Sequence, residues 1–271
     1  MISPDFGGWW QRGLSLAKLT WRQILALQAV VAVLTFGTQT LAGTWQSFAL
    51  RDIEEDAAAG RDPEIATFLA GSGLLLAASV VLLLVSMVAT LAAVRIVVEA
   101  AAGREPDLGA AVAGAARRLF PTLGWGIIAG LIILVGVCAC VVPGLYFAAV
   151  FLVLPAVVAV ERGNAISRCF KLFHGNLGSS LARVATIFGL TIGAGIVASI
   201  VGGIAGLAAP PATASSTAII AVAAVTAAVG AVISGAVRLF LDPLTVAAYA
   251  DMRARIEPLS TPMLAHELGI R

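Results

Sequence analysis

Long stretches without any charged residue alternate along the chain with short stretches that hold nearly all of its charge. An apolar stretch of about 18 residues or more predicts a transmembrane helix, because ~20 residues rising 1.5 Å each cross the hydrocarbon of a bilayer. The sequence therefore predicts an all-α, polytopic integral membrane helical bundle with six transmembrane helices. We place them at residues 24–43, 66–94, 119–142, 145–160, 181–207 and 217–237.

The third and fourth predicted helices are separated by only two residues, Pro143 and Gly144. A Pro-Gly pair is typical of a tight turn, so we expect these residues to form a hairpin turn. The fourth helix is short, and Pro155 is expected to kink or break it. An arrangement with five crossings, in which 119–160 spans poorly, stays open at this stage.

Charge distinguishes the two sides of the predicted bundle. With six crossings, fifteen of the 17 basic residues fall on one side. The other side keeps Arg51 and Arg61 beside the acids Asp52, Glu54, Glu55, Asp56, Asp62 and Glu64. The positive-inside rule assigns the basic side to the cytoplasm. We therefore expect an inner (cytoplasmic) membrane protein with both termini in the cytoplasm, and five crossings would place the basic C-terminal segment outside.

Composition agrees with a membrane protein. The chain is 60% hydrophobic and 12% charged, whereas a soluble domain is about 45–50% apolar and roughly 25% charged. Its net charge is only +2, and no dense basic stripe with interleaved aromatic residues is present. Nucleic acid is therefore not expected as a partner.

Short basic amphipathic helices are predicted before each odd-numbered crossing. Such helices suit the surface of an anionic leaflet, which makes membrane lipids the expected partners. The candidate contacts with a lipid headgroup or a protein partner are Arg12, Lys18, Arg22, Arg117, Arg118, Arg168 and Lys171. We interpret 1–271 as a single membrane domain of three surface-helix-plus-hairpin units, 8–99, 107–160 and 164–255, followed by a cytoplasmic tail at 256–271.

Two pairs of opposite charges lie where predicted crossings end on the basic side. Arg95 precedes Glu99 by four residues, and Arg238 precedes Asp242 by the same spacing. Residues four apart share one helix face, so each pair is expected to neutralise itself at the membrane interface.

Catalytic chemistry is not indicated by the sequence. An enzyme needs converging nucleophiles, acids, bases or metal ligands, and the chain has only two histidines, His174 and His266. Its three cysteines are expected to be buried as small apolar residues. We therefore expect no enzymatic activity, no cofactor and no metal site.

Three motifs in the C-terminal half carry a family resemblance. They are Val142-Pro143-Gly144-Leu145-Tyr146 with Pro155 and Glu161; Ala165, Arg168, Phe170, Leu172 and Gly175-Asn176; and Tyr249-Ala250-Asp251-Met252-Arg253. In these residues the chain resembles the membrane-domain family named after glycerophosphoryl diester phosphodiesterase, although members commonly have Ser-Trp where this chain has Cys169-Phe170. In fused members a separate soluble domain performs the hydrolysis. The resemblance implies a stand-alone membrane domain here, without that activity.

Two functions follow as hypotheses. The first is a non-enzymatic membrane protein that binds lipid or a partner, including another copy of itself, and supports membrane or envelope homeostasis. The alternative is a transporter or permease subunit for an apolar or amphiphilic substrate, because glycine-rich crossings and the break at Pro155 would permit movement.

Overall fold

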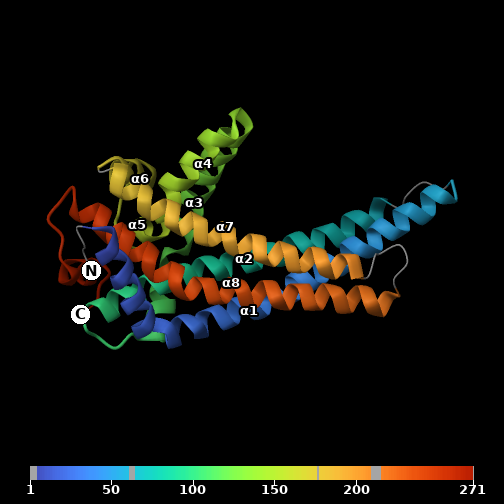
Figure 1. The fold of residues 1–271 in the computed structure, drawn as a ribbon, viewed down its shortest axis with the longest axis horizontal. Coiled ribbons are helices and arrows are strands. Elements are labelled where there is room, and N and C mark those ends of the chain that lie inside the picture. The colour runs from blue at the N-terminus through green and yellow to red at the C-terminus, as the bar shows by residue number, and fades with distance from the viewer. Residues whose placement is uncertain (1–4, 61–64, 176, 209–214, 271) are drawn as a thin grey trace. The chain divides into compact units, whose positions relative to one another are not determined.

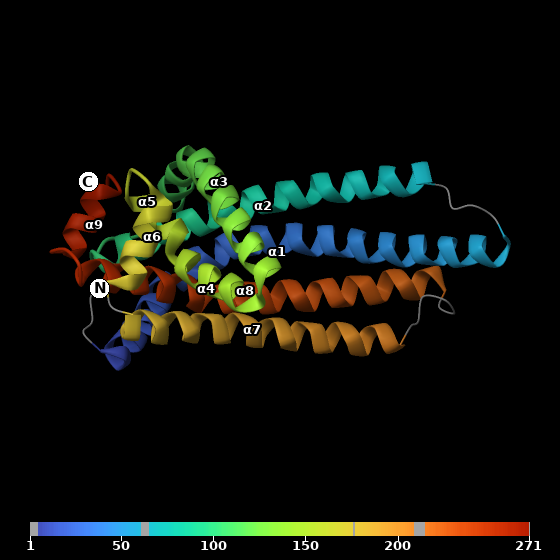
Figure 2. The same ribbon diagram turned by 90° about the horizontal axis from the view of Figure 1, so that it is seen from above.

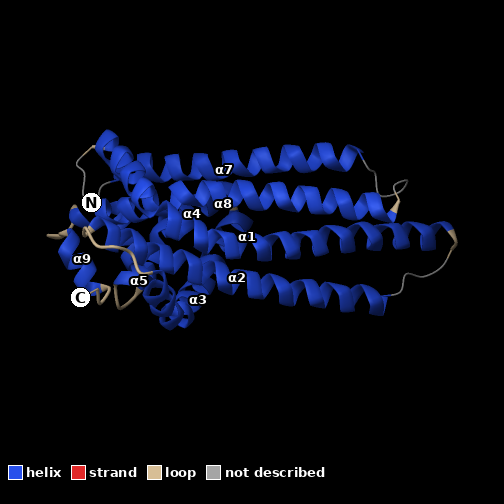
Figure 3. Cartoon of the chain, turned by 90° about the horizontal axis from the view of Figure 1, so that it is seen from below, coloured by secondary structure: helices blue, strands red, loops and turns tan. Residues whose placement is uncertain are grey.

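The computed structural model describes residues 5–60, 65–175, 177–208 and 215–270, and these are almost entirely helical (Figures 1 and 3). The elements in chain order are α1 Phe6–Ala58, α2 Ile65–Ala101, α3 Leu108–Ala139, α4 Val141–Val150, the 3-10 turn η1 Phe151–Val153, α5 Leu154–Val160, α6 Ala165–His174, α7 Leu177–Ala208, α8 Ser216–Ala254 and α9 Thr261–Glu267. Arg61, Asp62, Glu64, Asn176 and Arg271, used above, lie outside the described residues.

The prediction of an all-α membrane bundle is confirmed. Six helical segments among the described residues are long and apolar enough to cross a membrane, and no strand occurs in this part of the chain. Several helices run beyond the predicted crossings. The longest, α1, has 53 residues, which corresponds to about 80 Å and exceeds the thickness of a bilayer. Its ends therefore extend into polar surroundings, where Arg12 and Arg51 lie.

Contacts divide the chain into two compact units. Unit 2 comprises Gln28–Ser86 and Ile192–Ala236. It contains the C-terminal parts of α1 and α7 and the N-terminal parts of α2 and α8, which run side by side in Figure 2. Within unit 2, the ring of Trp45 packs directly against Gly71, where a Cβ would lie 2.2 Å from the ring. Many apolar side chains of these helices point outward, as expected for a surface that faces acyl chains.

Unit 1 comprises Met1–Leu27, Met87–Thr191 and Val237–Arg271. Its core is built from the C-terminal part of α2, from α5 and from the last turns of α8, whose apolar side chains are buried almost without interruption. Both described chain ends belong to this unit. The described part of the predicted tail packs within unit 1, since Leu264 and Ile270 are buried.

The turn between α3 and α4 differs from the prediction. The connection is the single residue Cys140, whose extended backbone (φ −174°) separates the two helices, while Pro143 and Gly144 lie in the first turn of α4. Proline is tolerated there because the first helical N–H groups have no intrahelical partner. Gly144 is needed for close approach, since a Cβ on it would lie 2.9 Å from the backbone nitrogen of Val137.

The predicted break near Pro155 is confirmed. The helix is interrupted by η1, and Pro155 then occupies the first turn of α5. The exposed connection to α6 follows, where the Asn164 side chain accepts a hydrogen bond from the Ser167 N–H (3.0 Å) and Gly175 ends the helix.

The three segments predicted as surface helices are all helical, but only α6 is a separate helix. The other two are the first turns of α1 and α3. The division into three surface-helix-plus-hairpin units stays a prediction. The expectation for the cysteines is wrong in part: Cys169 is buried, whereas Cys138 and Cys140 are exposed at the α3–α4 turn.

Candidate functional site

Two adjoining hollows open where α2, α3, α5 and α9 meet in unit 1. The larger has a volume of about 580 Å³ and the smaller about 290 Å³, and they share Arg118, Pro121 and Arg162 in their walls. We call them together the basic cavity. The basic side chains that line it are Arg95, Arg117, Arg118, Arg162 and Arg168, with His266 at the C-terminal end of α9.

The carboxylates at the cavity wall are already engaged. Glu267 accepts hydrogen bonds from both terminal nitrogens of Arg253, at 2.5 and 2.8 Å. Glu161 accepts one from Arg168 Nε at 2.5 Å and one from the Tyr249 hydroxyl at 2.7 Å. Neither carboxylate is therefore available to neutralise the remaining arginines of the cavity.

Three of those arginines have no ion-pair partner among the described residues: Arg117, Arg118 and Arg162. Arg118 is half-buried, and Arg117 and Arg162 are exposed. Burial, followed by the nearby charge of Arg162, lowers the pKa of Arg118. A cavity wall that holds uncompensated like charges is a favourable place for an anion.

The position of these arginines is set by local capping. Arg95 Nε donates to Glu99 at 2.8 Å, and the buried Glu99 also accepts from the backbone N–H of Asp107 at 3.1 Å. Asp107 in turn caps the start of α3 by accepting from the N–H of Ala110. The predicted pair Arg95–Glu99 is thus present, and it fixes the connection from which α3 carries Arg117 and Arg118 to the cavity.

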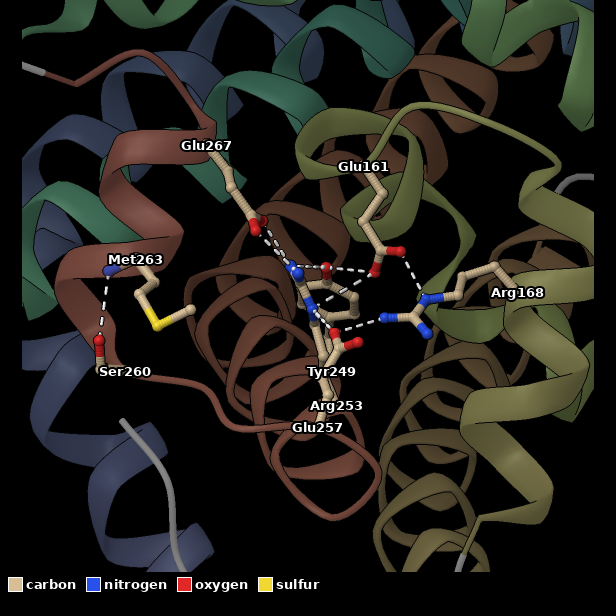
Figure 4. A network of polar contacts seen from close by, with 8 residues as sticks. All are labelled: Glu161, Arg168, Tyr249, Arg253, Glu257, Ser260, Met263 and Glu267. Atoms are coloured by element: carbon tan, nitrogen blue, oxygen red, sulfur yellow. Dashed lines mark hydrogen bonds and ion pairs between the residues drawn. The ribbon is translucent and has the colours of Figure 1, made fainter.

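A connected set of polar and charged groups borders the cavity through Glu161, Arg168 and Glu267, and we call it the ion-pair network (Figure 4). Its members come from two stretches that are distant in sequence: the end of α5 with α6, and the end of α8 with α9 and the segment between them. They are Glu161, Arg168, Tyr249, Arg253, Glu257 and Glu267.

Two arginines connect the carboxylates of the network. Arg168 joins Glu161 to Glu257. A terminal nitrogen of Arg168 lies 2.6 Å from a carboxylate oxygen of Glu257. Arg253 joins Glu257 to Glu267 and also donates to the Tyr249 hydroxyl at 3.1 Å. Partial burial disfavours the charged form of Glu257, but its hydrogen bonds with Arg253 and Arg168 outweigh this and lower its pKa.

A second buried pair lies beside the network. Arg183 on α7 and Asp251 on α8 approach to 3.0 Å, and their side chains are 1% and 0% exposed. The guanidinium of Arg183 also lies 5.9 Å from the ring of Trp9, whose indole N–H donates to the carbonyl of Leu244. The pair therefore joins α1, α7 and α8 within unit 1.

The predicted headgroup contacts fall into separate groups. Arg117 and Arg118 line the cavity. Arg12, Lys18 and Arg22 are exposed on the first turns of α1, and Lys171 is exposed on α6. Arg168 differs from the prediction, because both its neighbours in the network are carboxylates and its side chain is only 16% exposed. Its charge is neutralised inside the protein by these two carboxylates.

The second predicted interface pair, Arg238–Asp242, is also present at 3.4 Å. It lies at the wall of a separate hollow of about 210 Å³ beside Pro155. In the described part of the chain, no group of three or more His, Cys, Asp or Glu residues is placed to hold a metal ion. Burial, followed by the nearby charge of Glu161, raises the pKa of Cys169 to about 12.

Sequence reasoning missed Arg162 and the buried partners Arg183 and Asp251. Arg162 was counted only as one positive charge of a connection, because nothing local shows that it faces Arg118. The signal for the buried pair was a charged residue within an otherwise apolar helix, since such a residue is rarely left without a partner.

No protein-family model, curated protein or solved structure matches the chain. What the basic cavity binds is therefore inferred from its own geometry.

Proposed function

We propose that this protein is a non-enzymatic integral membrane protein that binds the phosphate of an anionic lipid headgroup in the basic cavity. The observation that carries the proposal is the convergence of Arg117, Arg118 and Arg162 on one cavity in which every wall carboxylate is already paired. Guanidinium groups match phosphate oxygens in charge and geometry. Basic pockets between membrane helices are characteristic binding places for anionic headgroups.

The rest of the cavity wall supports a lipid rather than a small soluble anion. Leu91, Ala159 and Pro121 contribute apolar surface, and Trp125 lies at the wall of the smaller hollow. Tryptophan is enriched at the level of lipid headgroups because its ring is apolar and its N–H is polar. A total of several hundred Å³ lies in the range of ligand pockets.

The positive-inside rule supports a cytoplasmic position for this basic end, and with it an inner-membrane protein whose termini are both cytoplasmic. Membership in the glycerophosphoryl diester phosphodiesterase membrane-domain family, as a stand-alone domain, is likewise a proposal. It is supported by the placement of the motif residues that suggested it. Glu161, Arg168, Tyr249 and Arg253 belong to the ion-pair network, and Asp251 to the buried pair.

The test is a lipid titration of the purified protein by native mass spectrometry, with phosphatidylglycerol and phosphatidylcholine of identical acyl chains. We expect a preference for phosphatidylglycerol. Replacing Arg117, Arg118 and Arg162 together by Gln should weaken it by about 100-fold. Each lost charged contact is taken to weaken binding by roughly 1 kcal/mol. This value is low for a charged contact because two of the three side chains are exposed.

The matched control replaces Arg12, Lys18 and Arg22 by Gln, which removes the same charge from the exposed start of α1. We expect this variant to keep most of the preference. Equal losses in both variants would mean that diffuse surface charge attracts the lipid, and no preference in the parent protein would contradict lipid-phosphate binding altogether.

The alternative function, a transporter or permease subunit, is favoured by one observation. The 210 Å³ hollow lies beside the interruption at Pro155, with the Arg238–Asp242 pair in its wall. Movement of α5 at this break would change the hollow. If the protein transports a substrate, distances between a spin label near η1 and a second label on α8 should fall into two populations. A single distance in all conditions would argue against transport.

A further inference from the structure

The α3–α4 hairpin is unusual among the apolar segments of this chain because it turns within a single residue. Cys140 alone separates the two helices, and α4 packs back along α3. Their contact is close at glycine: a Cβ on Gly136 would lie 3.0 Å from the Cα of Gly144. No polar loop is available at this turn to lie in water on the far side of a membrane.

The surroundings of Tyr146 limit how deep the turn can lie. The hydroxyl of Tyr146 is 3.0 Å from Nε2 of the exposed His174, and its ring packs against Phe170 and Phe173. All three partners lie on α6, which presents Lys171 outward on the basic side of unit 1. Tyr146 is therefore held at the level of a charged surface helix.

Tyr146 follows Cys140 by only six positions. At 1.5 Å per residue this is about 9 Å of helix, whereas the hydrocarbon of a bilayer is about 30 Å thick. Measured along α4 from Tyr146, and allowing for the reach of the tyrosine side chain, the turn lies short of the opposite interface. The hairpin is thus long enough to enter a leaflet from the basic side but is anchored too near that side to leave the membrane on the other.

The surface of the turn is suited to acyl chains. No charged residue occurs between Arg118 and Glu161, and Val141 and Val142 are 70% and 71% exposed. So continuous an exposed apolar surface is strongly unfavourable in water. The partner that fits a patch without any charge is the hydrocarbon of a lipid leaflet.

The backbone at the turn is also adapted to a site with little water. The Cys140 N–H donates to the carbonyl of Gly136 at 2.9 Å, and the Gly144 N–H points to the carbonyl of Cys140 at 3.5 Å. Pro143 has no N–H at all. A helix start normally leaves four N–H groups to bond with water. At α4 the Cys140 N–H is already bonded and Pro143 has none, so two of the four need no water, and no side chain caps the helix.

We propose that the α3–α4 hairpin is re-entrant: it enters the leaflet that faces the basic side, turns at Cys140 among the acyl chains, and returns to the same side. The chain then crosses the membrane with α1, α2, α7 and α8, which keeps both termini on one side. This goes beyond the proposed headgroup site and does not depend on it, because the hairpin's depth is set by Tyr146 and α6 rather than by the arginines.

Native cysteines make the proposal directly testable. Cys138 and Cys140 are exposed at the turn, so spin labels can be attached there in single-cysteine variants that otherwise differ from the parent only by Cys→Ser changes. In liposomes, collision rates with oxygen and with a water-soluble nickel chelate give the depth of each label. Membrane-impermeant maleimide, applied from each face, reports exposure to water.

We expect both labels to lie in the hydrocarbon of one leaflet, nearer the basic face, and to be shielded from the impermeant reagent on both faces. Reactive controls are Ala57→Cys, exposed on α1 among the acids, and Ser167→Cys, exposed on α6; each should react from one face only and from opposite faces. Reaction of Cys140 from the Ala57 face would establish a complete crossing. Reaction from the Ser167 face would place the hairpin in water. Either result overturns the proposal, and neither bears on the headgroup titration.

Discussion

Replacing only one partner of the buried Arg183–Asp251 pair is predicted to destabilise unit 1 more than breaking any other of its polar contacts. Both side chains are at most 1% exposed and their charged atoms are 3.0 Å apart. Asp251→Asn removes the negative charge at nearly constant volume. The arginine is then left buried beside Trp9 without its main counter-charge.

The cost of breaking such a pair is about 3–5 kcal/mol, because the remaining ion keeps its desolvation penalty without compensation. For a chain of this size, 1 kcal/mol lowers the melting temperature by roughly 2–4 °C. Asp251→Asn is therefore expected to lower the melting temperature by ~6–20 °C. Arg183→Met, which removes the guanidinium from beside the buried carboxylate, should have an effect of similar size.

Replacing both partners should cost less than either replacement alone. In Arg183→Met/Asp251→Leu neither charge of the pair remains, and well-packed apolar groups often substitute for a buried ion pair without loss. Melting of the detergent-solubilised protein, followed by intrinsic fluorescence and by retention of the folded peak on size exclusion, measures all three variants. Arg51→Met is the control, because Arg51–Glu55 is an exposed i,i+4 pair worth at most about 0.5 kcal/mol.

The reasoning is refuted by either of two results. One is a shift of Asp251→Asn no larger than that of Arg51→Met. The other is a double variant whose loss equals the sum of the single losses, since additivity would show that the two charges do not interact.

Three further predictions concern the same unit. Because the pKa of Glu257 is lowered in the folded protein, its stabilising effect is present above the unfolded pKa of about 4.3 and is lost as the pH falls through the lower folded value. The difference in melting temperature between Glu257→Gln and the parent should thus shrink below about pH 4. Gly144→Ala should destabilise by about 1–3 kcal/mol in thermal melting, because the added methyl overpacks the α3–α4 contact. Cys169 should resist maleimide in the folded, detergent-solubilised protein and react after denaturation, because its thiol is buried and its pKa is raised to about 12.

Matched controls make these measurements decisive. Gly130→Ala lies on the same helix pair but adds a methyl into open space, so it should not lower the melting temperature, because alanine is also the better helix former. A constant effect of Glu257→Gln from pH 7 to pH 3 would show that the carboxylate is not held by its arginine partners. Labelling of Cys169 as fast as that of Cys138 would contradict its burial.

Periodicity and composition sufficed to predict the helical bundle, its apolar segments and the pairs Arg95–Glu99 and Arg238–Asp242. They also located the break at Pro155. Each of these depends on residues within a few positions of one another, where helix geometry sets the neighbours in advance.

The position of the hairpin turn was misjudged at Pro143-Gly144 for a related reason. Proline and glycine usually mark turns, but here Gly144 serves the close contact with Gly136 and Pro143 fits the first turn of α4. Which of these roles applies depends on the approach of a second helix, and the local sequence does not contain that information.

The candidate site itself was decided by tertiary structure. Arg168 and Arg118 are both basic residues of amphipathic helical segments, yet the first is paired internally with Glu161 and Glu257 while the second faces the basic cavity. Arg183 finds Asp251 across 68 positions of sequence. Charge and hydropathy along the chain determined that these residues lie at one end of a membrane bundle. Only the packing of α5, α6, α8 and α9 decided which charges neutralise each other and which remain to attract a ligand, because that depends on contacts between helices whose relative positions no local pattern encodes.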